Sequence, residues 1–461
     1  MKLRYLGFMA LIMAGCNDTT QTAETAKEEK IRLVTLEPGH FHAALVQKSM
    51  YPSLDSTVYV YAPEGNELKA HLNLINQYNT RTDAPTNWKE EVYTGPDYVD
   101  KMLSDKKGSV VVLAGNNQKK TDYISKSINA GFHVLADKPM AIDEKSFAVL
   151  EQAFATAKEK DLLLYDIMTE RYEITTMLQR EFSLIPEVFG TLEKGTVGNP
   201  AVTKESVHHF YKYVSGNVLT RPAWFFDVQQ EGDGITDVTT HLVDLVQWEC
   251  FPEQVIDYKK DIALQNAKRF GTNLTLSQFK AITKLDSFPG YLKKDISKDS
   301  ILTVFSNGEI NYKIKDVHAK VSVIWNYKAP EGTGDTHYSI MRGTKANLII
   351  RQGAEQQYKP ALYIEPVGKK DEAFAGTLNE KLKALQAKFP GVELKEYAKG
   401  WEVIIPEKYK EGHEAHFARV TEKFLEYLQK GNMPAWEVPN MIAKYYTTTA
   451  ALAMALKTGK K

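Results

Sequence analysis

Cysteine is scarce in this chain of 461 residues, which contains only Cys16 and Cys250. Two cysteines are too few for a disulfide framework. An excess of one charge is also missing, because 58 Lys and Arg residues balance 58 Asp and Glu residues. A chain without a basic excess gives no electrostatic reason to expect nucleic acid as its partner. Beyond residue 16 no apolar run is long enough to span a membrane, so we expect a globular chain of two or three domains.

The first 16 residues have the order of a secretory signal. A short basic region precedes the apolar run 6–13, and a box of small residues then ends in Cys16. This ending is similar to bacterial lipoprotein signals, whose cysteine is lipidated and becomes the mature N-terminus. We expect a lipoprotein signal peptide over 1–16, lipidation at Cys16 and a flexible tether over 17–30. These features predict a protein anchored by lipid in the bacterial cell envelope, although an uncleaved anchor is the alternative.

Strand-like and helix-like patterns alternate from residue 31 to residue 167. The run Ser109–Ala114 is continuously apolar, as in a strand buried on both faces. This alternation predicts a Rossmann-type domain over 31–167, with a doubly wound parallel sheet and helices on both faces. In such sheets ligands bind at the carboxyl ends of the strands. The strands are expected at 31–36, 57–62, 109–114, 132–136 and 162–166, and the helices at 41–50, 67–77, 122–130 and 144–158.

Shorter alternating runs replace this pattern after residue 167. They predict a C-terminal α+β domain over 168–461, built on an open, mostly antiparallel sheet. A helix is expected inside this region at 235–249. The predicted fold class is therefore α/β, with the active site between the two domains.

One helical pattern carries the strongest functional signal. Asp237, His241 and Asp244 lie at i, i+4 and i+7, so on a helix they share one face. No Lys, Arg or Glu occurs over 234–248, which indicates that this polar face lines a cavity. An imidazole four residues after a carboxylate can be oriented by it, as a general acid or base near neutral pH requires. The alternative is a structural histidine on a buried helix.

A lysine follows the strand expected at 132–136. Asp137-Lys138-Pro139 begins where this strand ends, and the proline fixes the backbone there. Lys138 is therefore expected in the ligand crevice, where its ammonium can donate to a substrate hydroxyl or share a proton. The alternative is a surface lysine in a turn.

These two motifs, in this order, resemble those of the Gfo/Idh/MocA family of nicotinamide-dependent sugar and polyol oxidoreductases. Members of that family carry E-K-P after the fifth strand, which Asp137-Lys138-Pro139 matches with Asp for Glu. Their second-domain helix carries G-G-G-x-x-x-D-x-G-x-H-x-x-D, which is matched here by Gly232, Asp237, His241 and Asp244. The similarity extends over most of the chain and is strongest to exported, lipid-anchored members with their own C-terminal extension.

The resemblance implies roles for individual residues. His241 would take the hydroxyl proton, Asp237 would support the charge of His241, and Lys138 would stabilise the developing alkoxide. The first domain would bind NAD or NADP. The cofactor contacts implied by matching positions are Gly39, His42, Glu64, Asn117, Asp137 and Pro139.

The first turn departs from the family's G-x-G-x-x-G-x-x-H. With His42 on the final histidine, Gly39 falls on the third glycine, whereas Val34 and Leu36 replace the first two. The missing glycines normally make the tight turn and let the backbone approach the pyrophosphate. The acidic residue expected at the end of the second strand is displaced to Glu64, which could reach a ribose or serve as a turn residue.

The predicted substrate contacts are Arg171, His209, Lys212, Arg221 and Trp224. Side chains alternate over 206–212, so one of two sets faces the site, and His209 or Lys212 is the favoured hydroxyl contact. An exposed Trp224 beside Arg221 suits sugar stacking with hydrogen bonding, although domain packing is an equal alternative for Trp224. Arg171 belongs to a stretch that resembles the family's N-R-R.

No metal site is expected from the histidine spacing. The pairs His40/His42 and His413/His416 form neither an H-E-x-x-H motif nor a Cys/His cluster. Metal catalysis is therefore a weak alternative.

The expected function is NAD(P)-dependent oxidation of a hydroxyl of a sugar, glycoside or polyol. One alternative is an NAD-dependent glycoside hydrolase that reduces and reoxidises its cofactor within one turnover. Export favours this variant, because a retained cofactor needs no external pool. Another alternative is a cofactor-free carbohydrate-binding lipoprotein. The expected partners are a small carbohydrate and a membrane, without nucleic acid, while the sugar, the oxidised carbon and any homo-oligomer stay open.

Overall fold

The computed structural model describes residues 30–214 and 217–458 of the chain. The predicted signal peptide with Cys16, and residues 17–29 of the predicted tether, lie outside the described residues. Within the described part, no helix has both the length and the apolar character that crossing a lipid bilayer requires.

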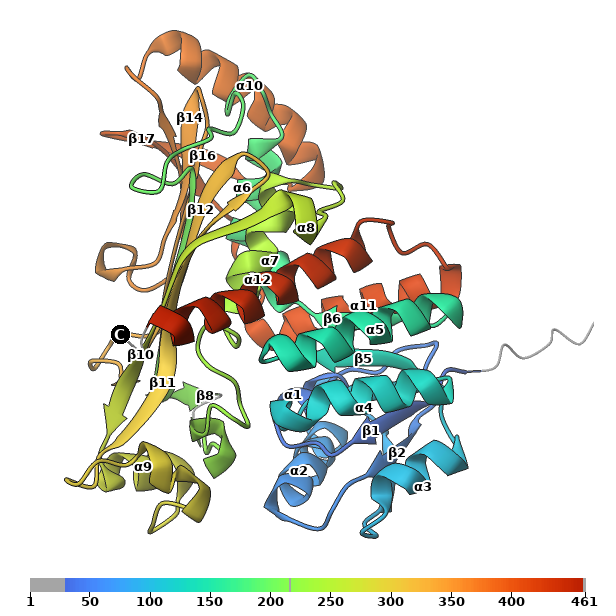
Figure 1. The fold of residues 1–461 in the computed structure, drawn as a ribbon. Helices are drawn as coiled ribbons and strands as arrows, with labels where there is room; N and C mark the ends of the chain where they lie inside the picture. The colour runs from blue at the N-terminus through green and yellow to red at the C-terminus, as the bar shows by residue number, and fades with distance from the viewer. Residues whose placement is uncertain (1–29, 215–216, 459–461) are drawn as a thin grey trace, which may run out of the picture. The chain divides into compact units, whose positions relative to one another are not determined.

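The first sheet is parallel, with the strand order β3-β2-β1-β4-β5-β6, which confirms the predicted doubly wound sheet (Figure 1). β1, β4 and β6 are buried along their whole length; β4 is continuously apolar, whereas Thr35 and Asp166 interrupt the apolar sequences of β1 and β6. The order reverses between β1 and β4, and ligands bind beyond the carboxyl ends of strands at such a point. The strands are β1 (Leu33–Leu36), β2 (Thr57–Tyr61), β3 (Lys89–Tyr93), β4 (Val110–Leu113), β5 (His133–Asp137) and β6 (Leu164–Ile167).

The edge strand β3 is missing from the sequence prediction. Its sequence Lys-Glu-Glu-Val-Tyr is mostly exposed or half-buried and contains no apolar run. It pairs with β2 alone, and charged side chains are common on such edges because they discourage pairing with other chains. Because neither face of β3 is buried, its sequence lacks the apolar pattern by which a strand is recognised.

The first helix, α1, is shorter than the helix expected at 41–50. The amides of Gln47 and Lys48 bond to carbonyls only three residues back, so the chain continues in tight turns. Pro52 then disfavours a helical conformation for the residue before it. The helices of the first half are α1 (His42–Leu45), α2 (Asn66–Thr80), α3 (Tyr98–Asp105), α4 (Asn117–Ala130) and α5 (Glu144–Glu159).

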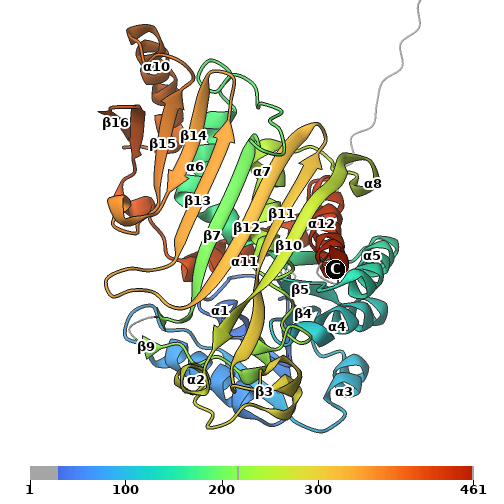
Figure 2. The same ribbon diagram turned by 60° about the vertical axis from the view of Figure 1, so that its left-hand side comes forward.

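The second sheet has the strand order β10-β11-β12-β7-β13-β14-β15-β17-β16. Its neighbouring strands are antiparallel except for β7 and β12, which confirms the predicted mostly antiparallel sheet. Figure 2 shows this sheet broadside, with α6 (Ile174–Ser183), α7 (Thr239–Cys250) and α12 (Glu437–Thr458) packed behind it. The strands are β7 (Val202–Tyr211), β10 (Ile262–Leu274), β11 (Leu302–Ile314), β12 (Val317–Lys328), β13 (Thr336–Arg342), β14 (Ala346–Arg351), β15 (Ala361–Pro366), β16 (Glu393–Tyr397) and β17 (Gly400–Ile404).

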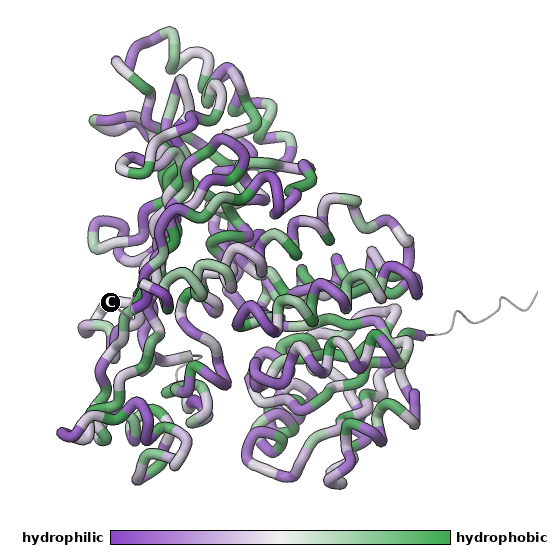
Figure 3. Tube along the Cα trace, viewed as in Figure 1, coloured by the Kyte–Doolittle hydropathy of each residue, from purple (hydrophilic) through white to green (hydrophobic). Residues whose placement is uncertain are grey.

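The last helices return to the first sheet. α11 (His413–Lys430) packs on β6, and its Phe417, Val420 and Phe424 belong to the first sheet's core. α12 contacts α5, α7 and β10, so it lies between the two sheets in Figure 1. Figure 3 shows hydrophobic and hydrophilic residues interspersed along these helices; α11 has one buried face, whereas α12 is buried on several sides. The end of the chain thus connects the two halves, because α11 covers β6 and α12 contacts both α5 and α7.

The helix α7 begins at Thr239 instead of at the predicted residue 235. The amides of Thr236 and Asp237 bond to the Asp233 carbonyl, so this segment forms turns. Gly234 passes so close to β11 that a Cβ there would lie 2.0 Å from the carbonyl oxygen of Ser306. This close approach to β11 holds the segment before Thr239 in turns.

A third hydrophobic cluster joins the end of β7 to the segment before α7. It includes Phe210, Trp224, Phe226, Phe279 and Trp325. The other described elements are η1 (Thr169–Tyr172), β8 (Tyr213–Val214), β9 (Asn217–Val218), η2 (Ala223–Phe226), α8 (Tyr258–Asp261), α9 (Leu276–Thr283), η3 (Gly290–Asp295), η4 (Ala354–Gln356), α10 (Glu372–Lys388) and η5 (Glu407–Tyr409).

Candidate active site

Lys138 follows the carboxyl end of β5, and its ammonium donates to the carboxylate of Asp237, which precedes α7. The Lys138–Pro139 peptide bond is cis. The side chains of Lys138 and Asp237 are 12% and 7% exposed. Burial opposes the ammonium charge, but the carboxylates of Asp237 and Asp137 outweigh it and raise the pKa of Lys138 above its ordinary value. Lys138 is therefore a charged hydrogen-bond donor at neutral pH.

His241 lies in the first turn of α7, and its Nδ1 is buried without a hydrogen-bond partner among the described residues. Burial lowers the pKa of His241 well below its ordinary value, and the nearby charge of Lys138 lowers it further. The imidazole is consequently neutral at neutral pH, the form that accepts a proton. The predicted support of His241 by Asp237 differs from the structure, in which the Asp237 carboxylate accepts from Lys138 instead.

Asp244, the third residue of the predicted polar face, accepts hydrogen bonds from the buried side chains of Arg171 and Lys444. Arg171 donates to both its carboxylate oxygens at 2.7 Å, and Lys444 donates to Oδ1 at 2.9 Å. Arg171 also donates to Glu437 at 3.1 Å, and Lys444 lies 2.7 Å from Asp166. This buried network joins β6, η1, α7 and α12. Every arm of the Arg171 guanidinium is thus used inside the protein, which corrects its prediction as a substrate contact.

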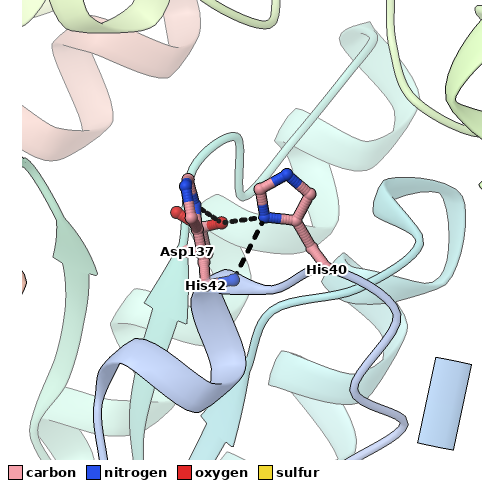
Figure 4. Close-up of side chains that lie close together, drawn as sticks. All are labelled: His40, His42 and Asp137. Carbon is pink, nitrogen blue, oxygen red and sulfur yellow. Dashed lines mark hydrogen bonds and ion pairs between the residues drawn. The ribbon is translucent and has the colours of Figure 1, made fainter. Parts of the chain in front are cut away.

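His42 lies beside Asp137, at the carboxyl ends of β1 and β5. The Asp137 Oδ2 atom lies 2.8 Å from His42 Nδ1 and 3.9 Å from His40 Nδ1 (Figure 4). Burial lowers the pKa of both imidazoles well below the ordinary value. Sequence reasoning noted the spacing of His40 and His42 but could not place Asp137 beside them, because it lies 95 residues after His42.

The turn between β1 and α1 differs from a pyrophosphate-binding turn. The amides of Gly39 and His40 both donate to the carbonyl of Ala114, at 3.2 and 3.1 Å. A Cβ on Gly115 would lie 2.4 Å from the Glu37 carbonyl, so only glycine lets the two turns approach this closely. The backbone donors that a glycine-rich turn offers to phosphate are therefore already bonded within the protein.

The neighbouring cavity fits the ribose end of a dinucleotide better. It has a volume of about 230 Å³ at the carboxyl ends of β1 and β2. Its lining includes Glu64, Asn116 and Lys119, which offer a carboxylate, an amide and an ammonium. Lys119 is paired with Glu37 at 2.6 Å and Asn116 donates to Gln230 at 2.9 Å, whereas the contact of Glu64 with Thr94 is long, at 3.5 Å. Glu64 is therefore the group most available to a ribose. Asn117, also predicted as a cofactor contact, is 4% exposed and donates to the Glu231 carbonyl at 2.7 Å instead.

Arg221 and Trp224 line a second cavity of about 360 Å³, together with the turn after β1 and residues of α2. Trp224 is only 9% exposed, so the prediction of an exposed tryptophan is wrong, and its ring also lines the smaller cavity. Arg221 is buried, donates to the Phe210 carbonyl at 3.1 Å and lies over the rings of Phe225 and Trp325. Because Arg221 and Trp224 both line this cavity, both are still candidates for ligand contact.

His209 and Lys212 meet at Asp335, in the loop between β12 and β13. His209 Nδ1 lies 2.9 Å and Lys212 Nζ 3.1 Å from this carboxylate. His208 also reaches it, at 3.4 Å, so the alternation expected over 206–212 does not separate the two histidines. Asp335 stands in a glycine-rich loop with no sequence pattern to mark it.

Two further ionisable groups near Lys138 were missed by sequence reasoning. Lys120 is 2% exposed, donates to Asn117 Oδ1 at 2.5 Å, and burial lowers its pKa to about 8. Burial raises the pKa of Glu231 well above its ordinary value, and the Asp237 charge adds to this effect. The only sequence signal was the position of Glu231 directly before Gly232, and Lys120 looks like an ordinary helix-surface residue.

Two family models match the chain. Residues 57–166 match the model described as "Oxidoreductase family, NAD-binding Rossmann fold". Residues 178–456, more than half of the chain, match the model described as "Putative oxidoreductase C terminal domain". The first match begins after the β1–α1 turn, the segment in which the expected glycines are missing.

Solved structures and a curated relative are also similar. A protein of Parabacteroides merdae, described as a "putative oxidoreductase", is 57% identical with a TM-score of 0.91, and the match covers 93% of this chain and 98% of that one. A 3-ketoreductase of Actinomadura kijaniata, solved with NADP and TDP-benzene, shares the fold at 13% identity and a TM-score of 0.54, over 92% of this chain and 98% of that one. An uncharacterized oxidoreductase of Schizosaccharomyces pombe is 25% identical over 155 residues, which span 33% of this chain and only 36% of that protein.

Proposed function

We propose that this chain, which belongs to the oxidoreductase family with an NAD-binding Rossmann fold, oxidises a hydroxyl group of a sugar, glycoside or polyol. Lys138 donates a hydrogen bond to the reacting oxygen, and its charge stabilises the developing alkoxide. His241 accepts the hydroxyl proton as general base. Asp237 acts as a positioning residue by holding the Lys138 ammonium. When bound, the nicotinamide supplies the acceptor for the hydride.

The state of His241 is the observation that carries this proposal. A buried imidazole normally satisfies its ring nitrogens, yet Nδ1 of His241 has no partner among the described residues. Burial, and after it the neighbouring Lys138 charge, lowers the pKa of this imidazole and keeps it neutral, so it can accept a proton from a bound alcohol. A neutral base next to a fixed positive charge is the pair that alcohol oxidation requires.

Two observations support a carbohydrate-like substrate. The fold is shared with a 3-ketoreductase that was solved with TDP-benzene, and a ketosugar and its alcohol are the two ends of one redox reaction. The 360 Å³ cavity is lined by the polar side chains of Arg221 and Glu67 and by the aromatic side chains of Trp224 and Phe225. Polar groups beside aromatic faces suit a carbohydrate ring.

Turnover with a panel of sugars, glycosides and polyols tests the proposal. Purified protein is mixed with NAD or NADP, and formation of reduced cofactor is followed by absorbance. His241→Ala and Lys138→Met should each lower kcat by about 10²- to 10⁴-fold. His318→Ala is a matched control, because His318 lies on β12 and contacts Gln265. Wild-type rates in either active-site variant would refute these roles.

A cofactor-free carbohydrate-binding protein is the second candidate. The amides of the β1–α1 turn donate to the Ala114 carbonyl and so do not face a phosphate. Calorimetric titration with NAD and NADP separates the two candidates. Dinucleotide binding supports the enzyme, whereas sugar binding without any dinucleotide binding supports the second candidate. A redox-assisted glycosidase would instead release the aglycone with no net reduction of NAD.

We also propose a lipid anchor at Cys16. Charged, apolar and small residues follow one another over 1–16 in the order found in lipoprotein signals. This anchor would place the enzyme in the cell envelope. Cys16→Ser should move the protein from the membrane fraction to the soluble fraction. Unchanged fractionation of this variant would contradict the anchor and leave the proposed reaction unaffected.

A further inference from the structure

We propose that His40, His42 and Asp137 bind one divalent transition-metal ion at the carboxyl ends of β1 and β5. The inference goes beyond the proposed function, which needs no metal. It rests on the convergence of three ligand atoms that come from two distant segments of the chain (Figure 4).

The distances suit a metal after a small adjustment. His42 Nδ1 and His40 Nδ1 lie 2.8 and 3.9 Å from Asp137 Oδ2, and all three atoms lie within 4.8 Å of one another. Ligands about 2.1 Å from one ion are separated by about 3.4 Å in a tetrahedral site and about 3 Å in an octahedral site. Rotations of the two rings that shift their nitrogens by up to about 1.4 Å would therefore accommodate the ion in a tetrahedral site.

A structural hydrogen bond explains only part of this cluster. Asp137 and His42 form such a bond at 2.8 Å, but His40 Nδ1 is too far from Asp137 for one. The His42 amide donates to His40 Nδ1 at 3.4 Å, which is long for a hydrogen bond. Two imidazole nitrogens that converge on one carboxylate oxygen leave a place between them for a positive charge.

The surroundings orient these ligands, as a metal site requires. The Lys138 amide donates to Asp137 Oδ1 at 2.9 Å, which leaves Oδ2 directed at the histidines. The His42 ring packs against Phe417, with ring centroids 4.5 Å apart. The Lys138 ammonium is paired with Asp237, so its charge is compensated before an ion binds.

The ligand types select the class of ion. Imidazole nitrogens suit Zn²⁺, Fe²⁺, Co²⁺ and Ni²⁺, whereas Mg²⁺ and Ca²⁺ prefer oxygen ligands. Two histidines and one carboxylate occupy three positions and leave at least one open, as in catalytic metal sites. The His40 side chain is 19% exposed, which gives this open position a route to solvent. A water or hydroxyl bound there would be polarised by the ion.

Titration with Co²⁺ tests the proposal, because tetrahedral Co²⁺ has intense visible absorption. The full purified chain, without an affinity tag, is treated with a chelator and titrated with Co²⁺ and then with Zn²⁺. We expect one equivalent to bind, and His40→Ala and Asp137→Asn to weaken binding by more than about 100-fold. His318→Ala, on the distant strand β12, should bind like the wild type.

The variants keep the result interpretable. His40 is the most exposed of the three ligands, so His40→Ala should remain folded, and circular dichroism checks this. No stoichiometric binding to the wild type, or unchanged binding to folded His40→Ala, would overturn the proposal. NAD binding is measured on the same samples. Metal binding without NAD binding would refute only the cofactor part of the proposed function, and the reverse would refute only the metal site.

Discussion

Removing the charge of Lys138 should destabilise the protein through the partner that it leaves behind. Lys138→Met keeps most of the side-chain volume but leaves the Asp237 carboxylate, 7% exposed, without its cation. Asp237→Asn conversely leaves the Lys138 ammonium without its carboxylate. Breaking a buried ion pair from one side costs about 3–5 kcal/mol, because the remaining charge is neither hydrated nor compensated.

The double variant Lys138→Met/Asp237→Asn removes both charges at once. Its free energy of unfolding should therefore lie well above the value expected from adding the two single losses. We expect a coupling of about 2–3 kcal/mol, the upper part of the range for residues in direct contact.

Urea unfolding at pH 7, followed by circular dichroism, measures this coupling. Lys194 and Asp316 provide a matched Lys–Asp pair at 3.2 Å that is 75% and 73% exposed. Their cycle should show no measurable coupling, since solvent screens exposed pairs. Additive losses at Lys138 and Asp237 would refute the view that the ammonium and carboxylate compensate each other.

Three further predictions concern pH and packing. Because the pKa of His241 is well below its ordinary value, kcat/KM should stay constant from pH 8 to about pH 6.5 and fall only at lower pH. A fall in kcat/KM with its midpoint near pH 6.5 would contradict a buried neutral base. Burial lowers the pKa of His71 to about 4, so the unfolded chain binds its proton first and stability is lost as the pH falls from about 6.5 to 4. His71 should account for about 3 kcal/mol of this loss, so the loss should be smaller by that amount in His71→Leu, while His40, His42 and His241 still contribute to it; equal pH dependence of both proteins in thermal melts would disprove the role of His71. Gly234→Ala should lower the melting temperature by several degrees, because its Cβ would lie 2.0 Å from the Ser306 carbonyl; an unchanged Tm would show that β11 can move.

Burial explains which strands the sequence could predict. β4 is buried on both faces, and such burial favours the continuous apolar run that reveals it; β1 and β6 are also buried throughout, with Thr35 and Asp166 among their apolar residues. β3 carries Lys-Glu-Glu at the sheet edge, where solvent accepts any polar side chain, so no pattern marks it. The packing of α11 on β6 is likewise invisible, because an amphipathic helix does not specify which core it covers.

The candidate site was predictable where its residues belong to one local motif. Lys138 follows a buried strand and His241 stands on a helix, so both positions follow from local patterns. Their pairing was not predictable, because Asp237 lies in a turn that β11 imposes and there meets Lys138 instead of His241. The same limit hid the contact of Asp137 with His40 and His42, which depends on the strand order β1-β4-β5.

The central claim is that Lys138 and His241 act on one substrate oxygen, and a kinetic double-mutant cycle tests it most directly. The rate of cofactor reduction is measured for the wild type, Lys138→Met, His241→Ala and the double variant with the best substrate of the panel. Residues that act as a unit give strongly non-additive losses, so the double variant should be within about tenfold of the slower single variant. Losses that multiply, or a single variant with the wild-type rate, would contradict the claim.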